Sequence, residues 1–367
     1  MPRRHWLRAT GALVLAAPAL EARAALPADP LRFPQDLGAH PAQRTEWWYI
    51  TGHATSQGRA FGFQVTFFRS RVAATQALAS RFAARQLVFA HAALTDLQGR
   101  QLLHDQRIAR WSGVPPGPDD AGQAHAAVGD TDIALGDWTL KRSAGRYQAR
   151  IAAGDFALAL DCAETQPLLL QGDAGLSRKG PDAAQTSRYY SLPQLAVAGA
   201  VTLRGRRFAL DAPAVRSNAA WLDHEWSDEL LHPEAVGWDW SGLNLFDGGA
   251  LTLFRLRRRD GSALWAGGSF RARGGAVQAF GADEVVFTPG RTWTSPRTGI
   301  RYPVEWTVDT PVGRFRIAAL LDDQELDSRS STGAVYWEGL SALRDAGGTA
   351  VGTGYLELTG YGDALKL

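Results

Sequence analysis

The stretch EWWYITGHATSQGRAFGFQVTFFRS, residues 46–70, contains two extended segments joined by the turn sequence SQGR. In its second half, residues 60–70, the side chains alternate with the period of a β-strand. The glycine turn between the two segments predicts an antiparallel hairpin. Residues 237–261, GWDWSGLNLFDGGALTLFRLRRRDG, repeat this arrangement, with tryptophan near the start, a glycine turn in the middle and Phe-Arg in the second segment. The sequence therefore predicts two similar hairpins.

A second pair of segments supports an internal duplication. Residues 137–160, DWTLKRSAGRYQARIAAGDFALAL, and residues 305–326, EWTVDTPVGRFRIAALLDDQEL, both begin with acid-Trp-Thr and both turn at Gly-Arg-aromatic. Because the two pairs occur in the same order, the chain reads as two copies of one unit. We expect two antiparallel barrels or strongly bent sheets, since closing a sheet removes its exposed edges and leaves an interior for an apolar ligand.

The length of 367 residues suits two domains, each able to bury its own core. We predict an all-β fold with an N-terminal domain at residues 40–220 and a C-terminal domain at residues 221–367. The Ala-rich segment 72–94 suits either a helix or, in its last part, a strand. We expect it to form a long excursion that covers one barrel mouth.

Composition excludes several functional classes. The net charge is only +2 and no basic run occurs, so we expect no nucleic-acid partner. The single cysteine, Cys162, excludes intramolecular disulfides and Cys-based zinc cages. The sequence contains no G-x-S-x-G, H-E-x-x-H, Walker or G-x-G-x-x-G motif, and its histidines match no ligand template. We therefore expect neither a metal nor a cofactor.

Residues 1–24, MPRRHWLRATGALVLAAPALEARA, have the order of a secretory signal. Arg3 and Arg4 precede a short apolar run, and Ala22-Arg23-Ala24 follows it as a cleavage site. The paired arginines favour the twin-arginine route. The apolar run is shorter than the ~20 residues that a transmembrane helix needs. We expect cleavage after Ala24 and a periplasmic or otherwise exported protein.

Several motifs in order along the chain resemble one known family. They are EWWYITGHA (46–54), GLSRKG (175–180), SRYYSLPQLAVAGAV (187–201), AWLDHEWSDE (220–229), GWDWSGLNL (237–245), YWEGL (336–340) and GYLELTGY (354–361). The chain resembles the carotenoid 1,2-hydratases, or hydroxyneurosporene synthases, and their AttH-like secreted relatives. The resemblance implies two lipocalin-like β-barrel domains in tandem. It also implies the addition of water to a terminal isoprenoid double bond, a reaction that requires no cofactor.

Residues 221–240, WLDHEWSDELLHPEAVGWDW, hold the candidate catalytic residues. In an extended conformation, Asp223 and Glu225 point to one side and His224 and Trp226 to the other. An acid beside a positioned imidazole suits protonation of an alkene, with His224, Glu225 and Asp223 as the catalytic candidates. Alternatively, His224 and Trp226 pack between the domains while the two carboxylates accept hydrogen bonds.

The ligand-binding candidates are aromatic and acidic side chains in this run, near the domain junction and in the first hairpin: Trp226, Trp238, Asp239, Trp240, Tyr189, Tyr190 and Trp48. We expect Glu338 and Glu357 to pair with arginines on neighbouring strands, and Lys179 to be solvated. The resemblance has one departure. Hydratases carry an acid and a tyrosine on the strand after the second-domain turn, where this chain has Phe254 and Leu256.

The sequence favours an exported protein that binds an apolar isoprenoid or lipid in a cleft between the domains. A second hypothesis is an enzyme, either a hydro-lyase of the carotenoid 1,2-hydratase type or a polyene isomerase or cyclase. A third is an accessory partner of a membrane transport system, which rests on the signal sequence alone.

Overall fold

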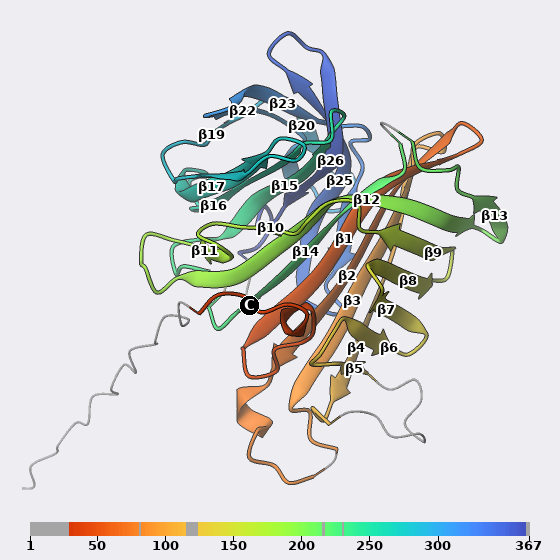
Figure 1. Cartoon of the computed structure of the whole chain (residues 1–367), viewed down its shortest axis with the longest axis vertical. Helices are drawn as coiled ribbons and strands as arrows, with labels where there is room; N and C mark the ends of the chain where they lie inside the picture. The colour runs from red at the N-terminus through yellow and green to blue at the C-terminus, as the bar shows by residue number, and fades with distance from the viewer. Residues whose placement is uncertain (1–28, 81, 115–123, 215–216, 230, 365–367) are drawn as a thin grey trace, which may run out of the picture.

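The computed structural model describes residues 29–364 except positions 81, 115–123, 215–216 and 230. The predicted signal at residues 1–24 lies outside the described residues. The described chain is almost entirely β-structure, built from a 14-stranded sheet and a 10-stranded sheet (Figure 1), which confirms the predicted all-β fold class. Within this part of the chain, no helix is both long and apolar enough to cross a bilayer.

The first sheet contains β1 (Thr45–Ser56), β2 (Arg59–Arg71), β3 (Gln86–Asp96), β4 (Gln101–Trp111), β5 (His125–Ala126), β6 (Asp132–Leu135), β7 (Trp138–Ser143), β8 (Arg146–Ala152), β9 (Phe156–Ala163), β10 (Leu169–Leu170), β11 (Leu176–Arg178), β12 (Thr186–Leu203), β13 (Arg206–Ala209) and β14 (Ala219–Ser227). The second sheet contains β15 (Gly237–Leu245), β16 (Ala250–Arg257), β17 (Ala263–Arg271), β18 (Val277–Phe280), β19 (Val286–Pro289), β22 (Glu305–Thr310), β23 (Gly313–Ala319), β24 (Glu325–Ser328), β25 (Ala334–Asp345) and β26 (Ala350–Leu358). A small separate sheet pairs β20 (Thr292–Thr294) with β21 (Arg301–Pro303), and the 3-10 helices are η1 (Gln35–Leu37) and η2 (Ala73–Thr75).

The two large sheets share one plan. In the first, the path runs β4-β3-β2-β1-β14-β12-β9-β8-β7, and in the second it runs β18-β17-β16-β15-β26-β25-β23-β22-β19. Each unit therefore pairs its first strand with its last, β1 with β14 and β15 with β26. Pairing of first with last strand curls a sheet toward closure, so the shared plan agrees with the expected duplication.

The junction between the two units differs from the predicted boundary at residue 221. Residue 221 lies inside β14, which fills the gap between β1 and β12 and hydrogen-bonds to both. The second unit begins only at Gly237, with β15. The run 221–240 is thus divided, with WLDHEWS in the first sheet and GWDW in the second. Sequence pattern could not reveal this, because β1, one of the two strands that flank β14, lies at the other end of the first unit along the chain.

Segment 72–94 contains no α-helix among its described residues. It forms the short η2 turn and then most of β3, whose residues from Gln86 onward continue the first sheet. The strand alternative for its last part is the one that the structure adopts, because residues 86–96 pair along their whole length with both β2 and β4.

Each unit has its own hydrophobic core with a buried acid–arginine pair. In the first, Arg69 Nε lies 2.8 Å from Glu46 Oε2, and both side chains are fully buried. In the second, Arg255 Nε lies 2.5 Å from Asp239 Oδ2, and its guanidinium stacks 4.4 Å from the ring of Trp306. The two pairs occupy equivalent places in the two hairpins, so they strengthen the case for duplication.

Hydrogen bonds join the two units. Within the described residues, His91 Nδ1 lies 2.9 Å from the Tyr336 hydroxyl, and Trp240 Nε1 donates to the Tyr189 hydroxyl at 3.1 Å. Thr252 contributes a hydroxyl that accepts from the Gln171 amide at 2.9 Å. Since buried polar groups that cross an interface must keep their partners, these bonds fix how the two sheets face each other.

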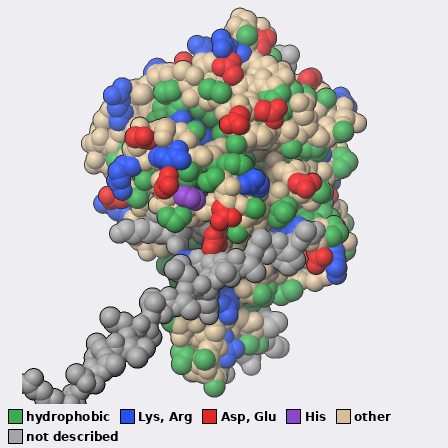
Figure 2. All heavy atoms as spheres, turned by 90° about the vertical axis from the view of Figure 1, so that its left-hand side faces the viewer, with side chains coloured by type: hydrophobic (Ala, Val, Ile, Leu, Met, Phe, Trp, Pro, Cys, Tyr) green, Lys and Arg blue, Asp and Glu red, His purple; other side chains and the backbone are tan. Residues whose placement is uncertain are grey.

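The exterior is mixed in charge. On the face shown in Figure 2, lysine and arginine side chains alternate with aspartate and glutamate over the described surface, and no broad area of one sign is visible. This distribution agrees with the small net charge of the sequence.

Replacing Arg69 by methionine leaves Glu46 buried without its guanidinium partner, so we expect Arg69→Met to lower the free energy of unfolding by about 3–5 kcal/mol. Urea titration followed by tryptophan fluorescence measures this loss. Arg314→Met is the matched control, because the Arg314–Asp309 pair is exposed and should change stability little. Equal losses in the two variants would contradict a stabilising role for the buried pair.

Candidate functional site

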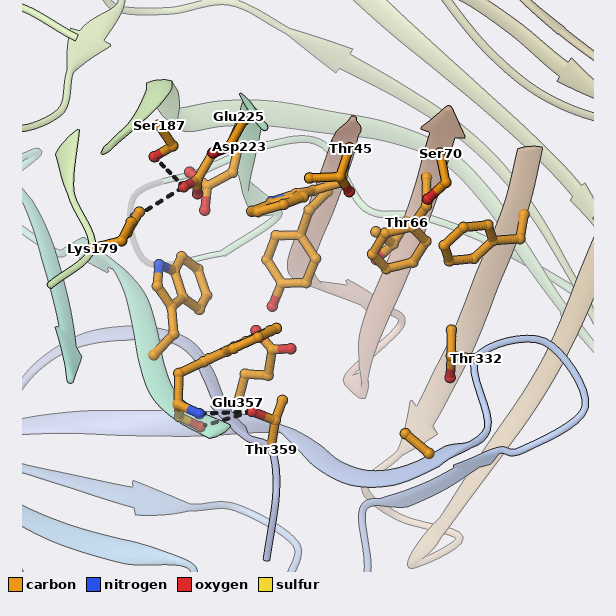
Figure 3. Close-up of a pocket in the computed structure, with 18 of the residues that line it drawn as sticks. Thr45, Thr66, Ser70, Lys179, Ser187, Asp223, Glu225, Thr332, Glu357 and Thr359 are labelled. Atoms are coloured by element: carbon orange, nitrogen blue, oxygen red, sulfur yellow. Dashed lines mark hydrogen bonds and ion pairs between the residues drawn. The ribbon is translucent and has the colours of Figure 1, made fainter. Parts of the chain in front are cut away.

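A cavity of about 420 Å³ lies between the two sheets. Its wall is formed by β1, β2, β3, β12 and β14 of the first unit and by β15, β16, β25 and β26 of the second (Figure 3). Most of the exposed wall is aromatic or aliphatic, with a few acidic, hydroxyl and amino groups among the rings. The volume lies within the roughly 300–1,000 Å³ range typical of small-molecule sites.

The duplicated hairpins contribute equivalent residues to the cavity. On the first wall, Trp47 pairs with Phe68 on β2 and with Glu225 on β14. On the second wall, Trp240 pairs with Phe254 on β16 and with Glu357 on β26, in the same relation. All six side chains line the cavity. The cavity therefore lies where the two copies face each other, with one glutamate from each.

Asp223 is the most extensively hydrogen-bonded acid of the first wall. Its carboxyl accepts hydrogen bonds from Ser191 Oγ at 2.5 Å, from Trp221 Nε1 at 2.6 Å and from the Tyr189 hydroxyl at 2.8 Å. These donors favour the carboxylate, but complete burial outweighs them and raises the pKa of Asp223 to about 7. Near neutral pH the group can therefore either hold or accept a proton.

Glu225 has a cationic partner. Its carboxylate lies 3.0 Å from Lys179 Nζ and accepts a hydrogen bond from Ser187 Oγ at 2.5 Å (Figure 3). The Lys179 ammonium also lies against two rings, 4.7 Å from the centre of Tyr189 and 4.6 Å from that of Phe254. This group forms the charged end of the cavity.

Glu338 and Glu357 are directly opposite each other on β25 and β26. The Tyr49 hydroxyl, from the first unit, donates a hydrogen bond to Glu338. Burial, followed by the charge of Glu357, raises the pKa of Glu338 well above its usual range, and burial raises that of Glu357 to about 7. Two carboxyls side by side, one buried and one partly buried, cannot both ionise readily, so the pair retains a proton near neutral pH.

The structure separates the candidate residues into two groups. Five line the cavity: Asp223, Glu225, Tyr189, Trp238 and Trp240. The others face the cores, because adjacent residues of a strand point to opposite sides. His224, Trp226, Tyr190 and Trp48 belong to the buried interior of the first unit, and Asp239 to that of the second.

His224 belongs to a closed hydrogen-bond network. Its Nε2 lies 2.9 Å from Glu46 Oε1, and its Nδ1 lies 2.9 Å from the Tyr190 hydroxyl. Burial lowers the pKa of His224 to about 4, so the ring is neutral near pH 7. The Trp48 ring stacks on it at 4.5 Å. These contacts make His224 a packing residue of the first core that does not reach the cavity.

The described residues include one group with metal-ligand spacing, His40, Glu46 and His224, whose ligand atoms lie within 4.8 Å of one another. Each imidazole is already hydrogen-bonded to Glu46 Oε1, and Arg69 is paired with Oε2. A cation here would lie beside a guanidinium. The arrangement therefore fits a hydrogen-bonded ion network better than a metal centre.

Sequence reasoning assigned other roles to three ionisable residues of the site. Lys179 was expected in solvent but is mostly buried, with its side chain in the cavity wall. Glu338 and Glu357 were expected to pair with arginines, yet their neighbours are Tyr49, Trp238 and each other. For Glu357, the duplication was the sequence signal that could have identified it. Glu225 pairs with Trp47 in the first unit, and the equivalent register pairs Glu357 with Trp240 in the second.

Comparison with known proteins agrees with the fold and the motifs. A family model described as AttH-like matches residues 24–361. The chain belongs to the AttH-like family. One AttH-like relative, an AttH protein from Nitrosomonas europaea, is 45% identical with a TM-score of 0.82, and the match covers 92% of this chain and 99% of that one. The predicted resemblance to AttH-like proteins is therefore confirmed.

More distant structures share the fold of this AttH-like chain. Kievitone hydratase from Nectria haematococca is 14% identical with a TM-score of 0.69, over 91% of this chain and 94% of that one. CghA is 12% identical with a TM-score of 0.50, over 87% and 88% of the two chains. At these identities the likeness concerns the fold alone. No curated protein sequence matches the chain.

The raised pKa of Asp223 gives a pH-dependent signal. We expect infrared absorption of protonated carboxyl groups to decline as the pH rises through about 7, and Asp223→Asn to remove part of that decline. Because the folded pKa exceeds the ordinary value of 3.8, this group contributes stability below about pH 4 and loses that contribution as the pH rises through about 7. Asp309→Asn, at an exposed site, is the control. An unchanged infrared profile in Asp223→Asn would contradict the assignment.

Proposed function

We propose that the protein binds an apolar isoprenoid or lipid in the cavity between its two units and acts on it by proton transfer, as a hydro-lyase or an isomerase. One observation carries the proposal. Asp223 and Glu338 are buried acids and Glu357 is a partly buried one, and all three have raised pKa values in walls that are otherwise largely aromatic. Such groups cost stability and contribute little to holding a hydrocarbon, whereas an acid-base catalyst requires them.

The two walls suit opposite roles in hydration. The Glu338–Glu357 pair holds a proton, and Glu357 can deliver it to an alkene carbon to leave a tertiary cation. The faces of Trp47, Trp238 and Trp240 line the same cavity and can stabilise positive charge.

Asp223 supports the second half of the reaction. As a carboxylate it can take a proton from water while the water oxygen bonds to the cation, which yields an alcohol. The hydrogen bonds from Ser191, Tyr189 and Trp221 hold its carboxyl in place for this step. Return of that proton to the Glu338–Glu357 pair completes the cycle, and the only reactants consumed are the alkene and water. Loss of a proton from the cation in place of water attack would give isomerisation.

A carrier without turnover is the second candidate. Phe254 and Leu256 line the cavity on the strand where the resemblance to hydratases leads one to expect an acid and a tyrosine. Both side chains enlarge the apolar surface and neither can donate a proton. This feature favours retention of a ligand without chemistry.

Identification of the natural ligand comes first. The protein is purified from its own host, and the apolar molecule released on denaturation is identified by mass spectrometry. That compound is then incubated with wild type, Glu357→Gln and Asp223→Asn. We expect both variants to bind it, with turnover reduced by roughly 10²–10⁴-fold, the usual contribution of a general acid or base.

Asp309→Asn and His224→Ala are the controls for this experiment. The first changes an exposed acid, and the second changes a buried residue that does not line the cavity, so its effect on turnover should follow its effect on stability. Stoichiometric binding by wild type with no turnover would establish the carrier. A protein that binds no apolar compound would overturn both candidates.

We also propose that residues 1–24 direct export. Arg3 and Arg4, the apolar run and Ala22-Arg23-Ala24 support this proposal. Changing both arginines together, Arg3→Lys with Arg4→Lys, should leave the uncleaved precursor in the cytoplasmic fraction. Cell fractionation with mass spectrometry of the N-terminus measures this. Unchanged processing after Ala24 would contradict the twin-arginine route.

A further inference from the structure

The buried acids of the first wall lie at one side of the cavity. In the order of the sheet, the lining residues on the strands are Ser187 and Tyr189 on β12, Asp223, Glu225 and Ser227 on β14, Thr45, Trp47 and Tyr49 on β1, Thr66, Phe68, Ser70 and Arg71 on β2, and Leu87, Phe89 and His91 on β3. The buried charged residues, Asp223 and Glu225, thus lie at the β12 and β14 end, whereas Arg71 on β2 is exposed and most of the apolar residues lie toward β3. Four interstrand spacings separate β12 from β3, which corresponds to about 19 Å. This cavity suits a long molecule that is polar at one end.

Lys179 is the cation at the polar end. Of the described residues that line the cavity, Arg44 and Arg71 are also cationic, but both are exposed. The Lys179 side chain is only 15% exposed, and Figure 3 shows it close to Ser187 and Glu225. Among the described residues, the ion-pair partner of Lys179 is the Glu225 carboxylate.

The local fold aims Lys179 inward. Residues of β11 pair with β12, and the Lys179 amide donates to the Gln185 carbonyl at 2.7 Å. The preceding residue, Arg178, stacks on the Trp265 ring at 4.6 Å. Lys179 instead lies against Tyr189 and Phe254. Since adjacent residues of an extended chain point to opposite sides, anchoring Arg178 on Trp265 directs Lys179 into the cavity.

The Lys179 ammonium has capacity to bind a ligand. It carries three N–H donors, of which Glu225 accepts one, while the nearby rings of Tyr189 and Phe254 are weak acceptors. A ligand oxygen would form a charge-assisted hydrogen bond that is much stronger than contact with a ring. Stability alone does not explain the residue, because well-packed apolar side chains in place of a buried ion pair are often neutral or stabilising.

We propose that Lys179 binds an oxygen acceptor, a carboxylate or a carbonyl, at one end of an otherwise apolar substrate. The cavity then selects an oxygen-terminated chain over a pure hydrocarbon. This inference rests on the proposed function, since it names the polar end of the ligand whose apolar part reacts. Lys179 is a specificity residue in this scheme and transfers no proton itself.

Three probes of equal chain length test the proposal: parinaric acid, its methyl ester and the corresponding octadecatetraene hydrocarbon. Binding is measured by quenching of the cavity tryptophans. For wild type, we expect the acid or the ester to bind roughly 10-fold to 100-fold more tightly than the hydrocarbon, as a hydrogen bond to a charged group provides. Preference for the acid over the ester would identify a carboxylate, and equal binding of the two would identify a carbonyl.

Lys179→Met should reduce binding of the oxygen-bearing probes to the level of the hydrocarbon and leave hydrocarbon binding unchanged. Because this variant leaves Glu225 unpaired, the double variant Lys179→Met with Glu225→Gln removes both charges and should give the same loss in a stable fold. Lys179→Arg should restore part of the preference. Lys141→Met is the control, because Lys141 is exposed on β7.

Equal affinity of wild type for all three probes would overturn the role of Lys179 but leave ligand binding in the cavity intact. Retention of the preference in the double variant would overturn it as well. The proposed proton transfer fails separately, if Glu357→Gln and Asp223→Asn convert the natural ligand as fast as wild type does.

Discussion

The pairing of β1 with β14 is the contact on which the rest of the structure depends. Its register sets Trp47 beside Glu225 and Tyr49 beside Asp223, all toward the cavity. A slip of one residue would exchange the two faces and turn the core residues outward. The buried contacts of Glu46 with Arg69 and His224 oppose such a slip, because they form only when these residues share the inner face.

The acidic side chains of the cores and those of the cavity differ in their ion-pair and hydrogen-bond partners. In the two cores, Glu46 and Asp239 each have a buried arginine, so their charge is compensated within the fold. In the cavity, Asp223 and Glu338 have hydroxyl or indole partners in place of a guanidinium. The first kind holds a barrel together. Acids of the second kind cost folding free energy when they ionise. They lie on the cavity surface that a ligand would contact.

Duplication explains why the site lies between the units. Each copy presents the same face of its first hairpin and its last strand, and the two faces are set against each other. The copies have since diverged. On the first wall Tyr189 pairs with Glu225, whereas on the second wall Glu338 has the equivalent position and pairs with Glu357. One wall therefore joins a single glutamate to a phenol and a lysine, while the other holds a pair of carboxyls. This asymmetry distinguishes a wall that carries a lysine from a wall whose carboxyl pair holds a proton.

The sequence alone determined the all-β class, the two hairpins and the duplication, since alternation and glycine turns are local patterns. It also determined that Asp223 and Glu225 lie on one side and His224 on the other, because that follows from strand geometry. Only the tertiary structure decided which side faces the cavity, and it is the side of the two acids. Likewise, Lys179 and Glu357 come together with Glu225 and Trp240 only through pairing between distant strands and the packing of one sheet on the other. Such register and packing depend on contacts far apart along the chain, which no local pattern encodes.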